Sequence, residues 1–376
     1  MQPLSITAVF DTVTDPRRDT ENKLHLLADI LAITTCAVIG GAETWEAIAE
    51  FGRTKESFFR RFLRLGNGIP SADTFGRVFA KLDPVAFAKA FGRWMAAACE
   101  ATGLIPVAID GKSARSAKRS TATGCLHVVT AWAAENRLVL GTAAVADGSN
   151  EIAAIPELLR VLDLAGAIVT IDAAGCQVEN ARIIREEKGH YLLTVKDNQP
   201  TLRAAVEAVF GRACEADFVG VRTDGHEEVD DGHGRHEERY VTVVYEPTGL
   251  PADWPDVAAV VLVNREREVG GERTTTSHYY ISSHAGAAAE FARWIRGHWD
   301  IENGLHWVLD VVFREDRSRV REGNAGTNLA MIRRVAASLL SRAPGKGSGV
   351  TKRLKAGWDE SYLLQVLQGI SACKVR

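Results

Sequence analysis

The chain has 376 residues, of which 46% are hydrophobic and 25% charged, the composition of a globular protein with two or three domains. Its net charge of -3 weighs against a small, uniformly basic nucleic-acid-binding module. The six cysteines are scattered without a Cys-x-x-Cys pair, which argues against a disulfide framework and favours a reducing cytoplasm. The longest apolar stretch, 24–41, contains His25 and Asp29, so we expect a buried helix and no membrane span.

Basic residues are not spread evenly along this slightly acidic chain. Each group is compatible with a solvated surface or with a phosphate-binding surface. The four groups are Arg60, Arg61 and Arg64; Lys112, Arg115, Lys118 and Arg119; Arg314, Arg317, Arg319 and Arg321; and Lys346, Lys352, Arg353 and Lys355.

Residues 1–100 have a helical pattern throughout, which predicts an all-α N-terminal domain. Thr44 and Ser71 are suited to cap the two short helices that follow them, and Asp83–Pro84 ends the second. These two helices are compatible with a helix-turn-helix-like pair or with a plain helical bundle.

Short apolar runs alternate with helical patterns in the region that follows. The predicted order over 105–197 is β-β-β-α-β-α-β, with a turn at Glu135–Asn136. Runs such as 105–110 and 167–172 lack polar alternation, which indicates strands buried on both faces. We therefore expect an α/β core.

The second half of the chain contains a β-rich insertion, expected at about 214–284. Within it, the His-rich segment 231–239 is predicted to form a hairpin loop, and Gly270–Gly271 a turn. A long helical pattern follows over 287–313. The predicted catalytic domain spans 101–342, and 343–376 is interpreted as a flexible link with a short basic tail.

Two aspartates each follow a short apolar run. Asp110 ends the first predicted strand and Asp172 ends a later one. Ligands bind at the carboxyl ends of strands in open α/β sheets. Two carboxylates on neighbouring strands repel each other unless a cation lies between them. Each aspartate is also compatible with a simple capping role. If the two aspartates share a metal site, their strands must be adjacent in the sheet, and this is what we predict.

Residues 298–310 form a second candidate site. At α-helical spacing His298, Glu302, His306 and Asp310 share one stripe, and the flanking tryptophans predict a partly buried Glu302. In one interpretation Glu302 joins the two aspartates on hard cations such as Mg²⁺. In the other, His298, Glu302 and His306 bind zinc, which leaves the aspartates unexplained.

Ordered motifs over nearly the whole chain resemble the DDE-type insertion-sequence transposases of the H-repeat-associated subgroup. The resemblance is carried by FDTVTDPRR (10–18), PSADTFGRVFAKLDP (70–84), AIDGKSARS (108–116), TIDAAGCQ (170–177), TVKDNQPTL (194–202), IRGHWDIENGLHWVLDVVFREDRSRVREGNA (295–325) and AGWDESYLL (356–364).

The resemblance implies an RNase H-like mixed-sheet core in which Asp110, Asp172 and Glu302 are the catalytic residues and hold two Mg²⁺ or Mn²⁺ ions. Relatives carry a Tyr-x2-Arg-x3-Glu-x6-Lys pattern around the glutamate. This chain departs from it, with Ile295, His298 and Leu309 at the tyrosine, arginine and lysine positions.

The implied activity is metal-dependent DNA strand cleavage and strand transfer at insertion-sequence ends. The partners would be double-stranded DNA, as terminal inverted repeats and target, and a second copy of the chain in the DNA complex. The protein would be bacterial and associated with the nucleoid when bound to DNA. Phosphate or base contacts are expected from Lys112, Arg115, Lys118, Arg119, Lys196, Arg296, His298 and Trp299.

Three alternatives remain open at this stage. Trp299 and Trp307 either stack on a displaced base or belong to the core. The chain is either an active transposase or an inactive or repurposed DNA-binding derivative of one. A zinc-dependent hydrolase built on His298, Glu302 and His306 is the second functional alternative.

Overall fold

The protein is described here as a computed structural model, which covers residues 6–19, 23–96, 98–99, 104–118, 125–146, 148–232 and 235–368. The chain forms two compact units. We call residues 1–100, 111–150 and 301–376 the helical unit, and residues 101–110 and 151–300 the sheet unit. Strand β1 (Ile105–Lys118) passes from the sheet unit into the helical unit. The units therefore do not follow the predicted segments 1–100, 101–342 and 343–376.

The helical unit combines both ends of the chain with a β-hairpin. Its N-terminal helices are α1 (Ile6–Asp11), α2 (Leu27–Ile39), α3 (Trp45–Thr54), α4 (Glu56–Phe59), α5 (Ala72–Lys81) and α6 (Pro84–Ala96). The hairpin is β2 (Cys125–Ala133) and β3 (Leu138–Ala144). The C-terminal elements are η1 (Ile301–His306), α11 (Trp307–Val311), η2 (Glu315–Arg317), α12 (Ala325–Arg342), α13 (Gly349–Trp358) and α14 (Glu360–Gln368).

The predicted helix starts in this unit are confirmed. The Thr44 hydroxyl accepts a hydrogen bond from the backbone N–H of Ala47 at 3.2 Å, and the Ser71 hydroxyl accepts one from Thr74 at 3.3 Å. Each satisfies a donor that the first helical turn leaves open. Pro84 begins α6, where its missing N–H costs nothing.

The prediction that 343–376 is a flexible link with a short basic tail is wrong. Most of it folds as α13 and α14, and Arg353 is buried there. The Arg353 guanidinium donates to the carbonyl oxygen of Val38 in α2 at 3.0 Å and lies over the Phe313 ring. Arg353, which the sequence suggested was a surface residue of a basic tail, is therefore a buried contact between α13 and α2.

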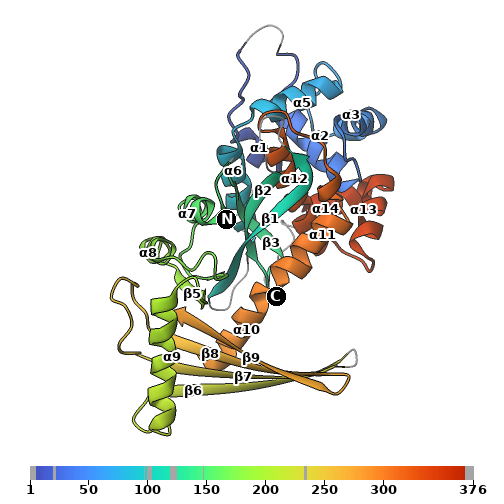
Figure 1. Cartoon of the computed structure of the whole chain (residues 1–376). Helices are drawn as coiled ribbons and strands as arrows, with labels where there is room; N and C mark the ends of the chain where they lie inside the picture. Colours follow the sequence, from blue (N-terminus) through green and yellow to red (C-terminus); the bar gives the residue numbers. More distant parts are fainter. Residues whose placement is uncertain are drawn as a thin grey trace. The chain divides into compact units, whose positions relative to one another are not determined.

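The sheet unit contains the strands that follow β1. They are β4 (Ala167–Ile171), β5 (His190–Val195), β6 (Thr223–Gly232), β7 (Arg235–Tyr245), β8 (Ala259–Val269) and β9 (Glu272–Ser282). Its helices are α7 (Glu151–Leu159), α8 (Val178–Glu186), α9 (Pro200–Glu215) and α10 (Ala288–His298). Figure 1 shows these elements in chain colours.

The strands are hydrogen-bonded in the order β3-β2-β1-β4-β5-β9-β8-β7-β6. Strands β1, β4 and β5 are parallel, whereas β2 with β3 and β5 through β9 to β6 are antiparallel. The predicted β-β-β-α-β-α-β order and α/β class are confirmed, and the first five strands form the RNase H-like core. The β-rich insertion continues this sheet from β5 as four long antiparallel strands.

The predicted turn at Gly270–Gly271 is confirmed, whereas the His-rich segment predicted as a hairpin loop is mostly strand. Gly270 and Gly271 connect β8 to β9 with φ of 60° and 86°, the left-handed conformation that a tight hairpin turn demands and glycine tolerates. The His-rich segment forms the paired strands β6 and β7, although His233 lies outside the described residues.

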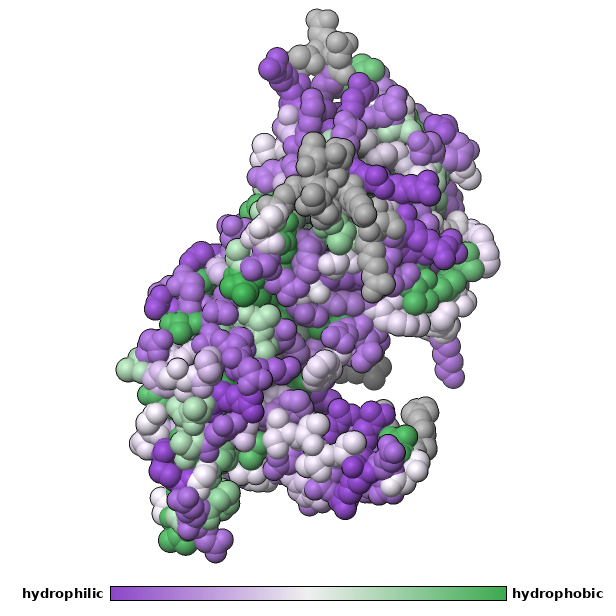
Figure 2. All heavy atoms as spheres, viewed as in Figure 1, coloured by the Kyte–Doolittle hydropathy of each residue, from purple (hydrophilic) through white to green (hydrophobic). Residues whose placement is uncertain are grey.

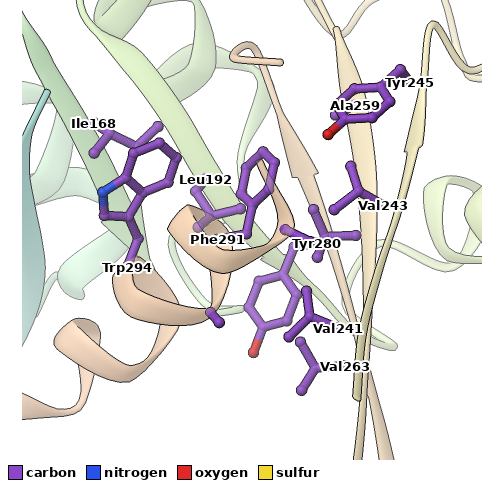
Figure 3. Close-up of a cluster of buried hydrophobic side chains, with 13 residues drawn as sticks. Ile168, Leu192, Val241, Val243, Tyr245, Ala259, Val263, Tyr280, Phe291 and Trp294 are labelled. Atoms are coloured by element: carbon purple, nitrogen blue, oxygen red, sulfur yellow. The ribbon is translucent and has the colours of Figure 1, made fainter. Parts of the chain in front are cut away.

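The core of the sheet unit lies between its strands and helix α10. Phe291 and Trp294 of α10 are buried against Ile168, Leu192 and Tyr280 of the sheet, as Figure 3 shows. Burial of such side chains contributes about 1.5–3 kcal/mol each. The face visible in Figure 2 is mostly hydrophilic, with apolar side chains in small groups. Within the described residues, the structure contains no helix of the length and apolar character that a bilayer crossing requires.

Close packing of α6 on β3 yields the first prediction. A Cβ atom on Gly92 would approach the carbonyl oxygen of Leu140 to 2.1 Å, so Gly92→Ala forces the helix off the strand. We expect it to lower the free energy of unfolding by about 1–3 kcal/mol in urea denaturation.

Gly211→Ala in α9 is the matched control, because a Cβ there meets nothing within 4 Å. Alanine is the better helix former, so this variant should be neutral or up to about 1 kcal/mol more stable. Equal stability of the two variants would contradict the close approach.

Candidate active site

The two predicted catalytic aspartates lie on adjacent parallel strands. Ile109 of β1 pairs with Ile171 of β4; Asp110 follows within β1, which continues to Lys118, and Asp172 is the first residue after β4. The pairing confirms the predicted adjacency, but the expectation that Asp110 ends its strand is wrong. Neighbouring strands are ~4.8 Å apart, and residues in register point to the same face. Both aspartates are half-buried.

The loop after β4 orients Asp172. Its Oδ1 accepts a hydrogen bond from the backbone N–H of Gly175 at 3.1 Å. Gly175 must be glycine, because a Cβ would approach Ile171 Cγ2 to 2.3 Å. The Asn198 side chain donates to the carbonyl oxygen of Ala173 at 2.6 Å, and Gln199 donates to that of Cys176 at 2.9 Å. The loop after β5 thereby fixes the loop that holds Asp172.

Helix α10 brings His298 to the end of β4. The His298 Nδ1 is hydrogen-bonded to the Thr170 hydroxyl at 3.0 Å. Burial lowers the pKa of His298 to about 4, and the negative charge of Asp172 offsets this only in part. His298 is therefore neutral at physiological pH, which disfavours the expected role as a cationic phosphate contact. Thr170 and Asn198 were not identified from the sequence as site residues.

Glu302 lies on a different type of helix from the one expected. Residues Ile301–His306 form a π-helical turn, so the regular α-helical stripe from His298 to Asp310 is not formed. Glu302 is exposed, and the predicted partial burial is wrong. The flanking Trp299 and Trp307 are 56% and 57% exposed and are not core residues. Single π-helical turns occur frequently at functional sites.

Among the residues that the structure describes, no three or more His, Cys, Asp or Glu side chains are grouped to hold a metal ion. Asp110 and Asp172 belong to the sheet unit and Glu302 to the helical unit. His306 also fits zinc poorly. Burial, together with Arg334, Lys112 and His127, lowers its pKa to about 3, and this positive environment opposes a bound cation.

Lys112 is buried in the helical unit. Its ammonium lies 2.7 Å from Asp310 and 3.7 Å from Asp316. These ion pairs join β1, two residues beyond Asp110, to α11 and η2. The interaction fixes elements of the fold, and Lys112 is not presented to DNA as the sequence suggested.

The other expected DNA contacts differ in their surroundings. Lys196 is exposed just after β5. Arg296 lies near Glu228 and Asp230 of β6, at 3.3 and 3.2 Å. Arg119 and the side chains of Arg115 and Lys118 lie outside the described residues.

An RNase H-like sheet preceded by a helical region is the architecture of the family to which the comparisons point. The family model described as "Transposase DDE domain" matches residues 101–340, and the model "DDE_Tnp_1-associated" matches residues 7–95. The chain belongs to the DDE transposase family.

Three relatives are similar over most of their length. "Putative transposase YncI" of Escherichia coli O157:H7 is 38% identical over 98% of this chain and 96% of its own. "H repeat-associated putative transposase YhhI" of Escherichia coli (strain K12) is 37% identical over 94% and 95%. "Uncharacterized protein in dhlA 3'region" of Xanthobacter autotrophicus is 44% identical over 73% of this chain and 93% of its own.

The depressed pKa of His298 predicts acid sensitivity. Its ordinary pKa is 6.5, and its folded value is about 4, so the unfolded chain binds more protons between these values. The stability contributed by neutral His298 is fully present above pH 6.5 and is lost as the pH falls through 4. In urea denaturation across this range, His298→Gln should show a shallower loss of stability than the wild type.

His236→Gln is the control for this titration. Hydrogen bonds to Asp231 and Glu238 raise the pKa of His236 to about 9, so its contribution is fully present at acidic pH. That variant should keep the wild-type acid slope. An unchanged slope in His298→Gln would mean that His298 is not held neutral.

Proposed function

We propose that this chain is an active transposase that cleaves DNA at insertion-sequence ends and transfers the strands to a target. The observation that supports the proposal is the parallel register of β1 and β4, which pairs Ile109 with Ile171, the residues immediately before Asp110 and Asp172. Glu302, exposed on a π-helical turn, would supply the third carboxylate. Family membership supports the same assignment.

The donor set fits hard divalent cations. Carboxylate oxygens are the ligands that Mg²⁺ and Mn²⁺ prefer, and a cation offsets the repulsion between the two aspartates. When bound, two such ions supply an activated water or 3′-hydroxyl, a stabilised leaving oxygen and neutralisation of phosphate charge. Asp110, Asp172 and Glu302 would hold the ions.

The remaining residues hold the ligands in place. Gly175 donates to one oxygen of Asp172, which leaves the second oxygen available to a metal. Asn198 and Gln199 restrain the backbone of that loop. Neutral His298 adds no positive charge beside Asp172, so it does not compete with a metal ion. Fixed ligands of this kind reduce the cost of reorganisation during reaction.

Substrate binding would use duplex DNA, both as transposon ends and as target, with two copies of the chain in the complex. Helix α5 is the proposed element of specific recognition. One face, with Phe75, Val78 and Phe79, is buried, and Asp73, Arg77 and Lys81 at intervals of four residues are exposed. Lys196 and Trp299 are further exposed candidates for DNA contact.

Asp110→Asn tests the catalytic proposal. The probe is a linear duplex carrying one end of the element as it flanks the coding region, incubated with Mg²⁺ or Mn²⁺. Cleavage should fall at least ~1,000-fold, because metal-based stabilisation of the transition state amounts to several kcal/mol. Binding to the same duplex should persist or strengthen, since a carboxylate that repels phosphate is removed. Ca²⁺ should not support cleavage.

Asp253→Asn, at an exposed loop position, is the matched control and should cleave normally. Equal loss of binding and cleavage in Asp110→Asn would make Asp110 structural. Cleavage in Zn²⁺ alone that survives Asp110→Asn but not His306→Ala would establish the zinc hydrolase. A wild-type chain that binds but never cleaves would be the inactive derivative.

The exposed tryptophans lead to a separate prediction. Trp299 and Trp307 flank Glu302 in sequence, and stacking of an unpaired base on an aromatic ring contributes about 1–3 kcal/mol. Trp299→Ala and Trp307→Ala should each weaken binding to a duplex with unpaired end bases by about 5- to 100-fold, and binding to a fully paired duplex much less. Fluorescence anisotropy measures both affinities.

Trp358→Ala is the control, because Trp358 is 76% exposed on α13, far from Glu302 in sequence. Replacement by Phe at 299 or 307 should retain most of the affinity. A loss of the same size in Trp358→Ala, or no loss at 299 and 307, would contradict base stacking.

A further inference from the structure

Residues 314–321 form a loop with an unusual division of charge. We call it the arginine loop. Its four arginines, Arg314, Arg317, Arg319 and Arg321, are exposed. Its two acidic residues behave differently, since Glu315 is buried and Asp316 is half-buried. The loop thus turns its positive charges outward and its negative charges inward.

The inward side chains are held by buried cations of the same unit. Glu315 forms an ion pair with Arg334 at 2.9 Å, and Asp316 lies 3.7 Å from the Lys112 ammonium. Arg333 donates to the Ser318 hydroxyl at 3.1 Å. Removing one partner of a buried ion pair leaves an uncompensated buried charge, so these anchors define the loop conformation strongly.

The arginine loop continues directly into the contact between α12 and α5. The backbone N–H of Asn324 donates to the carbonyl oxygen of Ala80 at 3.0 Å, and the Asn328 side chain donates to Phe79 at 2.9 Å. Gly323 has φ of 49°, and a Cβ there would approach the Ala80 oxygen to 2.6 Å. Figure 1 shows the orange-red segment beside α5. The end of α5, with exposed Lys81, and the loop are thus fixed to each other.

Exposure alternates along the second half of the loop. Arg317, Arg319 and Arg321 are exposed, whereas the intervening Ser318 and Val320 are partly buried. Ser318 has extended backbone angles. In an extended segment every second side chain points to the same side, at intervals of ~6.6 Å. The exposed Arg317, Arg319 and Arg321 therefore alternate with side chains that are partly buried in the protein.

We propose that the arginine loop binds the phosphate backbone of duplex DNA next to α5. This rests on the proposed function and adds a binding surface to it. Guanidinium groups bind phosphate oxygens in a bidentate manner, and contacts to phosphate fix register without reading sequence. A loop anchored before DNA arrives loses little conformational entropy on binding. The loop positions the duplex, and the exposed face of α5 reads it.

The test is the salt dependence of duplex binding by the full chain, with EDTA present so that no cleavage occurs. The probe is a fluorescent duplex carrying the element end, titrated at increasing KCl. Each phosphate contact contributes about 0.9 to the slope of log affinity against log salt. The double variant Arg317→Ala/Arg319→Ala should therefore lower the slope by about 1.8. Arg317→Lys/Arg319→Lys should keep most of it, since the charges remain.

Arg160→Ala/Arg182→Ala is the matched control. Both arginines are exposed in the sheet unit and lie within 2.8 Å of Glu179, so the variant removes the same net charge elsewhere. Its slope should equal that of the wild type. A slope for Arg317→Ala/Arg319→Ala equal to the control would overturn the proposal, while cleavage by the wild type would leave the transposase assignment intact. Absence of salt-dependent binding by the wild type would instead remove the proposed function itself.

Discussion

The parallel register of β1 and β4 is the constraint on which the candidate site depends. It pairs the residues immediately before Asp110 and Asp172, and two carboxylates close together raise the electrostatic free energy unless a cation or a proton intervenes. Several interactions of the fold hold the two strands and the loop after β4 in place. Apolar strands fix the register, Gly175 orients Asp172, and Asn198 restrains the loop.

Local signals in the sequence were sufficient for much of the fold. Thr44 and Ser71 cap helices because the hydroxyl and the open N–H groups are three residues apart in the chain. Gly270–Gly271 forms a turn because both residues need positive φ. The apolar runs that end at Asp110 and Asp172 lack polar alternation and therefore predicted buried strands. In the structure these strands are the parallel pair β1 and β4. Each of these features depends on neighbours in sequence or on one strong periodicity.

Features that depend on partners far away in the chain could not be predicted from local sequence patterns. Arg334 is fully buried because it meets Thr130, 204 positions away, and Glu315. Lys112 and Arg353 read as surface charges in sequence, yet both are internal. The π-helical turn at Ile301–His306 follows an α-helical pattern in the sequence, and only the structure reveals the changed spacing around Glu302. Contacts between residues distant in sequence, which local composition does not reveal, determine where these side chains lie.

The net charge of the chain is a poor guide to its DNA-binding surfaces, because those surfaces also depend on which charges are paired inside the fold. The value of -3 counts every ionised side chain equally, whether it faces solvent or a buried partner. Glu315 is neutralised internally by Arg334, and Glu237 is buried between Arg239 and Arg265. The Glu315–Arg334 pair contributes little to the field that an approaching phosphate experiences, because opposite charges in contact cancel at a distance, whereas Glu237 with its two arginines keeps one net positive charge. What an anionic polymer meets at the arginine loop is a set of exposed guanidinium groups, because the two acidic residues within the loop, Glu315 and Asp316, pair with buried cations. A slightly acidic chain can therefore carry a local surface suited to DNA.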